Sequence, residues 1–148
     1  PTKAEERQIL DRMGEFSEAQ LIASIRPVLH PEQLRELRVL VKSLYADDRI
    51  KNYLVELVAA TRSPKTYGLS DLADFVSFGA SPRATLSLLA TAKAHAFLAG
   101  RGYVIPEDVK EIAPDVLRHR VILSYEAEAE NVTSDQVVAK ILERVEVP

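Results

Sequence analysis

The residues with the clearest chemical meaning are Gly79-Ala80-Ser81-Pro82-Arg83-Ala84. Serine before proline is typical of a helix N-cap and first helical position, so we expect a helix from Ser81 to about Ala99 with Arg83 in its first turn. Free N–H groups and the positive end of the helix dipole disfavour a cation there by roughly 0.3–1 kcal/mol. An anion bound by these N–H groups and the guanidinium would offset this cost. The motif therefore predicts a phosphate site, with a solvated arginine as the alternative.

Motifs for ATP hydrolysis and metal binding are absent from the sequence. No glycine is followed by lysine, so the pattern G-x-x-x-x-G-K-[ST], which holds nucleotide phosphates, does not occur. His30, His95 and His119 lack the spacing of a zinc motif such as H-E-x-x-H, and packing or surface roles fit them better than metal ligation. We therefore expect the chain alone to be no enzyme, to bind no ATP or other cofactor tightly and to hold no metal.

Composition restricts the class of protein. The chain has 148 residues, of which 47% are hydrophobic, enough for one compact domain with its own core. It contains no cysteine, which excludes disulfides and favours a reducing compartment, so we expect a cytoplasmic protein. The formal net charge of −3 gives no general attraction to nucleic acid. No apolar run approaches about 18 residues, so membrane insertion is not expected.

Apolar residues at helical spacing predict helices along most of the chain. Thr2 and Glu5 form a capping box that opens a first helix, residues 1–14. A further helix is expected from Pro31 onwards. The stretch from Leu21 to Leu29 fits a short helix or an extended chain.

The clearest amphipathic helix opens at Asp47 and Asp48 and ends before Pro64. Its apolar face consists of Ile50, Tyr53, Leu54, Leu57, Val58 and Thr61. Between this helix and Gly79 we expect one or two helical turns. The core side chains expected from that segment are Leu72, Phe75, Val76 and Phe78.

The helix that begins at Ser81 is the most hydrophobic one, and we expect it to run through the middle of the bundle. Its large apolar side chains are Leu86, Leu88, Leu89 and Phe97. Gly100 should end it, and Pro106 should open another helix. Pro114 lies within that next helix and should kink it or split it in two.

Residues 123–148 are expected to form an acidic loop followed by a last helix from Thr133. The acids of the loop are Glu126, Glu128 and Glu130, and they fit a solvated loop better than a cation site. Together these patterns predict an all-α fold, a bundle of five to seven helices in which residues 1–148 form a single domain.

A series of motifs in fixed order supports a family resemblance. After the motif around Arg83 come Gly100-Arg101-Gly102-Tyr103-Val104, Pro106-Glu107-Asp108-Val109-Lys110, Ala113-Pro114-Asp115-Val116-Leu117 and His119-Arg120. This series resembles the C-terminal lid subdomain of MoxR-family AAA+ ATPases along most of the chain. The resemblance implies an AAA+ lid-type helical bundle whose first helix, residues 1–14, lies at the junction of the nucleotide-binding core and the lid. The Walker A and Walker B motifs of the core are not in this sequence.

The same resemblance implies roles for three residues. Arg83 corresponds to the sensor 2 arginine, which reaches from the lid to the γ-phosphate of ATP and couples nucleotide state to lid motion. Pro82 would approach the base or ribose, and Ile9 would form an apolar wall for adenine. The alternatives are ordinary helix initiation for Pro82 and core packing for Ile9.

The resemblance also implies a parent protein, meaning a longer protein that contains both this lid and the AAA+ core. The parent would bind ATP with Mg²⁺ and hydrolyse it in a chaperone-like assembly. Its implied partners are the core of the same chain, neighbouring subunits of a hexameric ring and proteins with von Willebrand factor A domains. The alternative function is a free-standing helical module for protein or nucleic-acid interaction without a nucleotide role, and the net charge speaks against nucleic acid.

Overall fold

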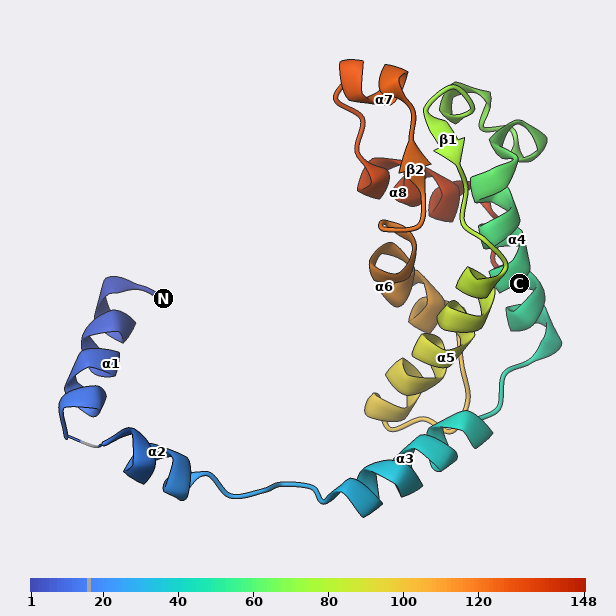
Figure 1. Ribbon diagram of the computed structural model, residues 1–148. Coiled ribbons are helices and arrows are strands. Elements are labelled where there is room, and N and C mark those ends of the chain that lie inside the picture. The colour runs from blue at the N-terminus through green and yellow to red at the C-terminus, as the bar shows by residue number, and fades with distance from the viewer. Residues whose placement is uncertain (16) are drawn as a thin grey trace. The chain divides into compact units, whose positions relative to one another are not determined.

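The computed structural model describes residues 1–15 and 17–148 and contains two compact units, residues 1–37 and 38–148. Helices dominate both units, which confirms the predicted all-α class (Figure 1). The described residues form eight α-helices rather than five to seven, because two short ones, α2 (Glu18–Ser24) and α7 (Tyr125–Ala129), add to the longer ones. The single-domain organisation of residues 1–148 stays a prediction.

The first unit contains α1 (Lys3–Glu15), α2 and the start of α3 (Pro31–Ser43). α1 has the predicted capping box. The Thr2 N–H donates to Glu5 Oε2 at 2.7 Å, and the Glu5 N–H donates to Thr2 Oγ1 at 3.4 Å. The stretch from Leu21 to Leu29 is helical only as far as Ser24.

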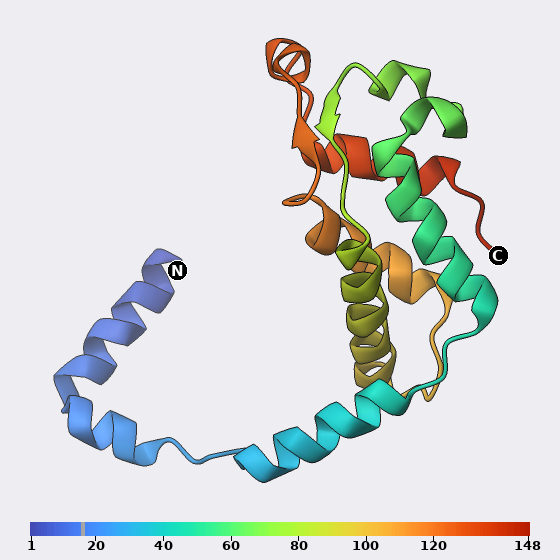
Figure 2. The same ribbon diagram turned by 45° about the vertical axis from the view of Figure 1, so that its right-hand side comes forward.

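The second unit holds the end of α3 and all later elements. These are α4 (Asp48–Arg62), the 3-10 helices η1 (Pro64–Tyr67) and η2 (Ser70–Leu72), β1 (Val76–Phe78), α5 (Arg83–Leu98), α6 (Pro106–Leu117), β2 (Ile122–Leu123), α7 and α8 (Ser134–Arg144). α5 packs against α4 and α6, and α8 packs against the same two helices (Figures 1 and 2). These four helices enclose the core, with fully buried side chains that include Leu54, Leu57, Leu88, Leu117 and Ile141.

α4 confirms the predicted amphipathic helix. Asp47 Oδ1 caps it by accepting a hydrogen bond from the Arg49 N–H at 2.9 Å, and the helix ends at Arg62. All six residues predicted for the apolar face are buried, namely Ile50, Tyr53, Leu54, Leu57, Val58 and Thr61.

The segment between α4 and α5 corrects the expectation of helical turns alone. η1 and η2 are present, but residues Val76–Phe78 form β1, which pairs antiparallel with β2. Val76 lies opposite Leu123 in this pairing. Strands of two and three residues are too short to show a recognisable alternation of apolar and polar residues. Leu72 is buried as predicted, whereas Phe78, also predicted for the core, is 68% exposed.

The start of α5 differs from its prediction. Ser81 is not the N-cap, because the helix begins at Arg83 with Pro82 in the cap position. The backbone N–H groups of Ala84 and Thr85 donate to the carbonyl oxygens of Ser81 and Pro82, at 2.8 and 3.1 Å. A main-chain turn therefore replaces the predicted side-chain cap.

The buried face of α5 also differs from its prediction. Leu86, which was expected in the core, is 68% exposed. The buried face consists of Ala84, Leu88, Ala92 and Ala96, spaced by four residues. Because three of these side chains are alanine, α5 can approach the neighbouring helices closely.

The C-terminal region includes one correction. Pro114 lies inside α6, which is one helix and not two, and the predicted alternative of a kink stays a prediction. The predicted acidic loop instead contains α7, which Ser124 caps by accepting a hydrogen bond from the Ala127 N–H at 3.3 Å. The predicted last helix is confirmed as α8, with Thr133 as its N-cap in a capping box.

Candidate functional site

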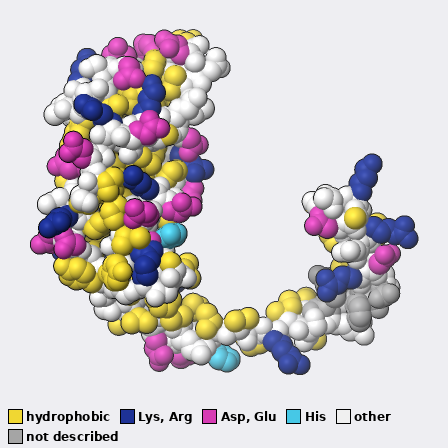
Figure 3. Space-filling model, turned by 180° about the vertical axis from the view of Figure 1, so that it is seen from behind, with side chains coloured by type: hydrophobic (Ala, Val, Ile, Leu, Met, Phe, Trp, Pro, Cys, Tyr) yellow, Lys and Arg dark blue, Asp and Glu magenta, His cyan; other side chains and the backbone are white. Residues whose placement is uncertain are grey.

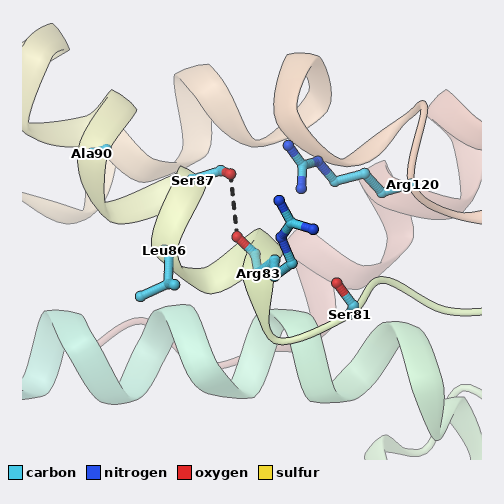
Figure 4. A pocket seen from close by; sticks show the side chains of 6 residues that line it. All are labelled: Ser81, Arg83, Leu86, Ser87, Ala90 and Arg120. Carbon is cyan, nitrogen blue, oxygen red and sulfur yellow. Dashed lines mark hydrogen bonds between the residues drawn. The ribbon is translucent and has the colours of Figure 1, made fainter.

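An open pocket of about 480 Å³ lies beside the first turn of α5 (Figure 4). Its lining consists of Ser81, Arg83, Leu86, Ser87, Ala90 and Arg120. All of these except Arg120 come from α5 or the residues directly before it, whereas Arg120 follows α6. The fold thus brings together two arginines that are distant in the sequence.

Arg83 is the first residue of α5, so it lies in the first helical turn as predicted. Its side chain is exposed, and its guanidinium has no hydrogen bond or ion pair within the part of the chain that the structure describes. The backbone N–H groups expected to share an anion with it are partly used, since those of Ala84 and Thr85 already donate to carbonyl oxygens. The guanidinium is therefore the main anion donor that this helix start offers.

Arg120 forms the opposite side of the pocket, where its guanidinium points toward that of Arg83 (Figure 4). The turn that carries it is fixed, because the N–H groups of Arg120 and Val121 both donate to the Leu117 carbonyl, at 2.8 and 3.1 Å. Arg120 Nε is buried and has no hydrogen-bond partner among the described residues. Sequence reasoning included Arg120 in the motif series of the family resemblance but gave it no binding role, because a cation near a helix end is ordinary.

The pocket carries two positive charges and no acidic side chain. Two other arginines of this unit pair with carboxylates, Arg101 with Asp108 and Arg118 with Asp115. Two guanidinium groups that face each other repel. An anion bound between them attracts both and so offsets this repulsion. The pocket can therefore bind an anion with several oxygens, such as phosphate.

A buried hydrogen bond from α4 positions the start of α5. Thr61 Oγ1 accepts from the Ala80 N–H at 2.9 Å and donates to the Val58 carbonyl at 2.7 Å, and Thr61 is fully buried. Gly79 lets the chain pass close to α4, because a Cβ at this position would lie 2.3 Å from the Thr61 carbonyl oxygen. Sequence reasoning placed Thr61 on the buried face of α4 but did not detect its hydrogen bond to Ala80.

The other end of the α5–α6 pair is joined by Asp108, which is fully buried. Its carboxylate accepts from Arg101 Nη1 at 2.7 Å and from the Ile105 N–H at 2.9 Å, and His95 Nδ1 lies 2.7 Å from Asp108 Oδ1. Burial alone would raise the pKa of Asp108, but the hydrogen bonds from Arg101, Ile105 and His95 outweigh it and lower the pKa from 3.8 to about 2. This ion cluster fixes α6 against α5 and so fixes both walls of the pocket.

Pro82 and Ile9, the two other predicted site residues, are not among the residues that line the pocket. Pro82 is exposed beside the pocket as the N-cap of α5, and it does not line the pocket. Ile9 lies on α1 in the first unit and is 51% exposed. The nucleotide contacts proposed for these two residues stay predictions.

No second functional cluster stands out in the described ranges. His95 contacts Asp108, His30 and His119 are exposed, and no three His, Cys, Asp or Glu side chains gather there as a metal site. On the face drawn in Figure 3, acidic and basic side chains of the second unit are interspersed rather than separated by sign. None of the helices formed by residues 1–15 and 17–148 has the length and apolar character needed to cross a membrane.

Comparisons with known proteins agree over most of the chain. Residues 70–141 match the AAA lid domain family. The chaperone MoxR1 of Mycobacterium tuberculosis is 38% identical over 148 residues, which cover 100% of this chain and 38% of MoxR1. The uncharacterized protein YeaC of Bacillus subtilis is 35% identical over 139 residues, which cover 94% of this chain and 41% of YeaC.

One solved structure also resembles this chain in its fold. The crystal structure of a candidate ATPase from Cytophaga hutchinsonii is 37% identical and has a TM-score of 0.88 to this chain. The match covers 99% of this chain and 43% of that chain. The chain therefore spans about two fifths of the length of these relatives.

Proposed function

The chain belongs to the AAA lid family and has MoxR-type relatives, and on this premise we propose that it is the lid of an ATPase. Arg83 is then the sensor 2 arginine, which contacts the γ-phosphate of ATP held on the nucleotide-binding core of the parent protein. One observation carries this assignment. Within the described residues the guanidinium of Arg83 has no hydrogen-bond or ion-pair partner, and it faces a second arginine in a pocket without acids.

The chemistry of the pocket fits phosphate. A guanidinium offers two parallel N–H donors to phosphate oxygens, and no carboxylate in the lining repels the phosphate. The lining also has no carboxylate to hold Mg²⁺, so the proposal assigns this metal to the core of the parent. ATP, when bound, supplies the γ-phosphate, and Arg83 neutralises negative charge that develops on its oxygens during hydrolysis.

Arg83 also couples the nucleotide to the position of the lid. Its neighbours Ala80 and Ala84 are fully buried, so Arg83 cannot shift far without the helices on which they pack. A contact between Arg83 and the γ-phosphate favours one lid position, and hydrolysis removes the partner of that contact. The lid would therefore move as the nucleotide changes from ATP to ADP.

The proposal extends to the assembly. The parent is a chaperone-like ATPase of the cytoplasm, in line with the absence of cysteine from this chain and with the name of MoxR1. Its subunits form a hexameric ring that acts on proteins with von Willebrand factor A domains. Pro82 approaches the base or ribose of the nucleotide, and Ile9 contacts adenine.

Steady-state ATP hydrolysis by the parent tests the role of Arg83. Arg83→Ala should lower kcat about ten- to a thousandfold, which corresponds to about 1.4–4 kcal/mol of lost transition-state stabilisation. Arg83→Lys should restore only part of the activity, because lysine keeps the charge but lacks the planar pair of donors. Arg49→Ala is the matched control, since Arg49 is an exposed arginine in the first turn of α4 and lies outside the pocket.

Normal turnover of the Arg83→Ala parent would contradict the assignment. Full recovery with Arg83→Lys would show that only the charge matters. Thermal unfolding of the 148-residue chain separates folding from catalysis, because an exposed side chain should change stability by no more than about 0.5 kcal/mol.

A further inference from the structure

We propose that Arg120 is a second phosphate-binding residue, so that phosphate is held between two guanidinium groups of the lid rather than by Arg83 alone. This inference rests on the proposed function, because it takes the pocket beside α5 to be the place where nucleotide phosphate meets the lid. It adds a residue from another element, the turn after α6, and assigns it direct contact with the phosphate oxygens.

Arg120 Nε is buried, although the residue as a whole is half-buried. An arginine at the surface can satisfy its donors with water, but Arg120 Nε is shielded from solvent and has no acceptor in the described part of the chain. A buried donor without an acceptor is costly, so such groups are nearly always paired. A turn of the side chain that opens Nε to the pocket would let a bound anion supply the missing acceptor.

The direction of the side chain is the second argument. Arg118, two residues earlier, pairs with Asp115 at 2.5 Å and with Asp135 at 3.2 Å. Arg118 thus has acid partners, whereas Arg120 pairs with none of the described acids and points toward Arg83 (Figure 4). Without an anion, this orientation places two positive charges face to face.

The number of donors favours phosphate over a carboxylate. One guanidinium satisfies the two oxygens and single charge of a carboxylate. Two guanidinium groups offer parallel donor pairs from two directions and two positive charges, which match the several oxygens and higher charge of a phosphate chain. The pocket therefore selects a phosphate chain, and a carboxylate from another protein segment is the competing occupant.

Titration of the 148-residue chain with inorganic tripolyphosphate at constant ionic strength tests this inference. Binding is followed through the Nε–Hε NMR signals of the arginines, and the Arg83 and Arg120 signals should shift together and saturate.

Arg120→Gln should raise the dissociation constant about tenfold, because it removes a charged donor group from the anion. Arg120→Lys should recover part of this loss. Arg118→Gln, which removes an arginine of the same turn that already has acid partners, should leave binding unchanged.

Different results overturn different parts of the account. If Arg83→Gln weakens binding and Arg120→Gln does not, the inference about Arg120 fails while the proposed function stands. If acetate shifts the Arg120 signal at the same concentrations as tripolyphosphate, the pocket binds carboxylates and the inference also fails. If neither substitution changes binding, both the inference and the use of this pocket for phosphate fail. If Arg120→Gln lowers the unfolding temperature, Arg120→Lys is the comparison, because it retains the charge. If the Arg120→Lys chain folds but does not recover binding, the inference is contradicted.

Discussion

Thr61 shows how a single hydroxyl group determines where the candidate site begins. It lies on α4, yet it accepts a hydrogen bond from the Ala80 N–H just before α5. Gly79 permits this approach because the Thr61 carbonyl occupies the space that a side chain would need. The position of Arg83 therefore depends on a polar contact inside an otherwise apolar helix face.

Thr61→Val should destabilise the 148-residue chain by about 1–3 kcal/mol. Valine has nearly the same size, but it leaves the buried Ala80 N–H without an acceptor. Urea unfolding measures the change. Thr91→Val is the control, because the Thr91 hydroxyl also donates to a backbone carbonyl, that of Ser87, but at an exposed position of α5. Equal stability of the Thr61→Val and wild-type chains would refute this account of Thr61.

At the scale of elements, the pair of α5 and α6 holds the two arginines at one end and the Asp108 ion cluster at the other. The carboxylate of Asp108 satisfies the Ile105 N–H at the start of α6 and binds Arg101 between the helices. Its lowered pKa means that the ionised form is the one that stabilises the fold. The stabilisation is complete above the unfolded-state pKa of about 3.8 and is lost as the pH falls through about 2.

Asp108→Asn should therefore have a pH-dependent effect. At pH 7 it should lower the free energy of unfolding by about 3 kcal/mol, since it leaves Arg101 without its buried anion. The difference from wild type should shrink between pH 4 and pH 2, where the wild-type carboxylate itself becomes protonated. Asp115→Asn, at a 77% exposed side chain, should show a small difference at every pH. Denaturant unfolding of both chains across this pH range measures the difference in free energy of unfolding. If the difference between Asp108→Asn and wild type stays constant with pH, the role of ionisation is contradicted.

The helix caps were predictable from the sequence because they depend on neighbours within three residues. Thr2, Asp47 and Thr133 each precede a helix as predicted. The apolar face of α4 was predictable for a similar reason, since helical spacing alone defines it. Arg83 was predicted for the first turn of α5 from the Ser-Pro-Arg sequence, although Ser81 itself is not the cap.

Features that depend on distant contacts were not predictable in this way. The pairing of Val76 with Leu123 joins segments that no local pattern relates. Ser124 illustrates the same limit, because its hydroxyl donates to the Asp74 carbonyl at 2.6 Å as well as capping α7. The place of Arg120 in the pocket follows from the packing of α6 against α5, which a linear motif does not encode.

At the scale of the whole molecule, the proposed function makes the chain one side of a nucleotide site. It spans about two fifths of its relatives, and its pocket offers cations for phosphate but no group for activating water or holding Mg²⁺. In the proposed parent, the AAA+ core supplies the remaining groups. In this proposal Arg83 completes the site by contacting the γ-phosphate in particular.

Equilibrium binding of ATP and ADP to the parent tests this claim most directly. ADP lacks the γ-phosphate, so only ATP should lose a contact when Arg83 is replaced. Under conditions that prevent hydrolysis, Arg83→Ala should raise the dissociation constant for ATP about tenfold or more and leave that for ADP unchanged. Equal weakening of both nucleotides, or no change in either, would contradict the assignment of Arg83 to the γ-phosphate.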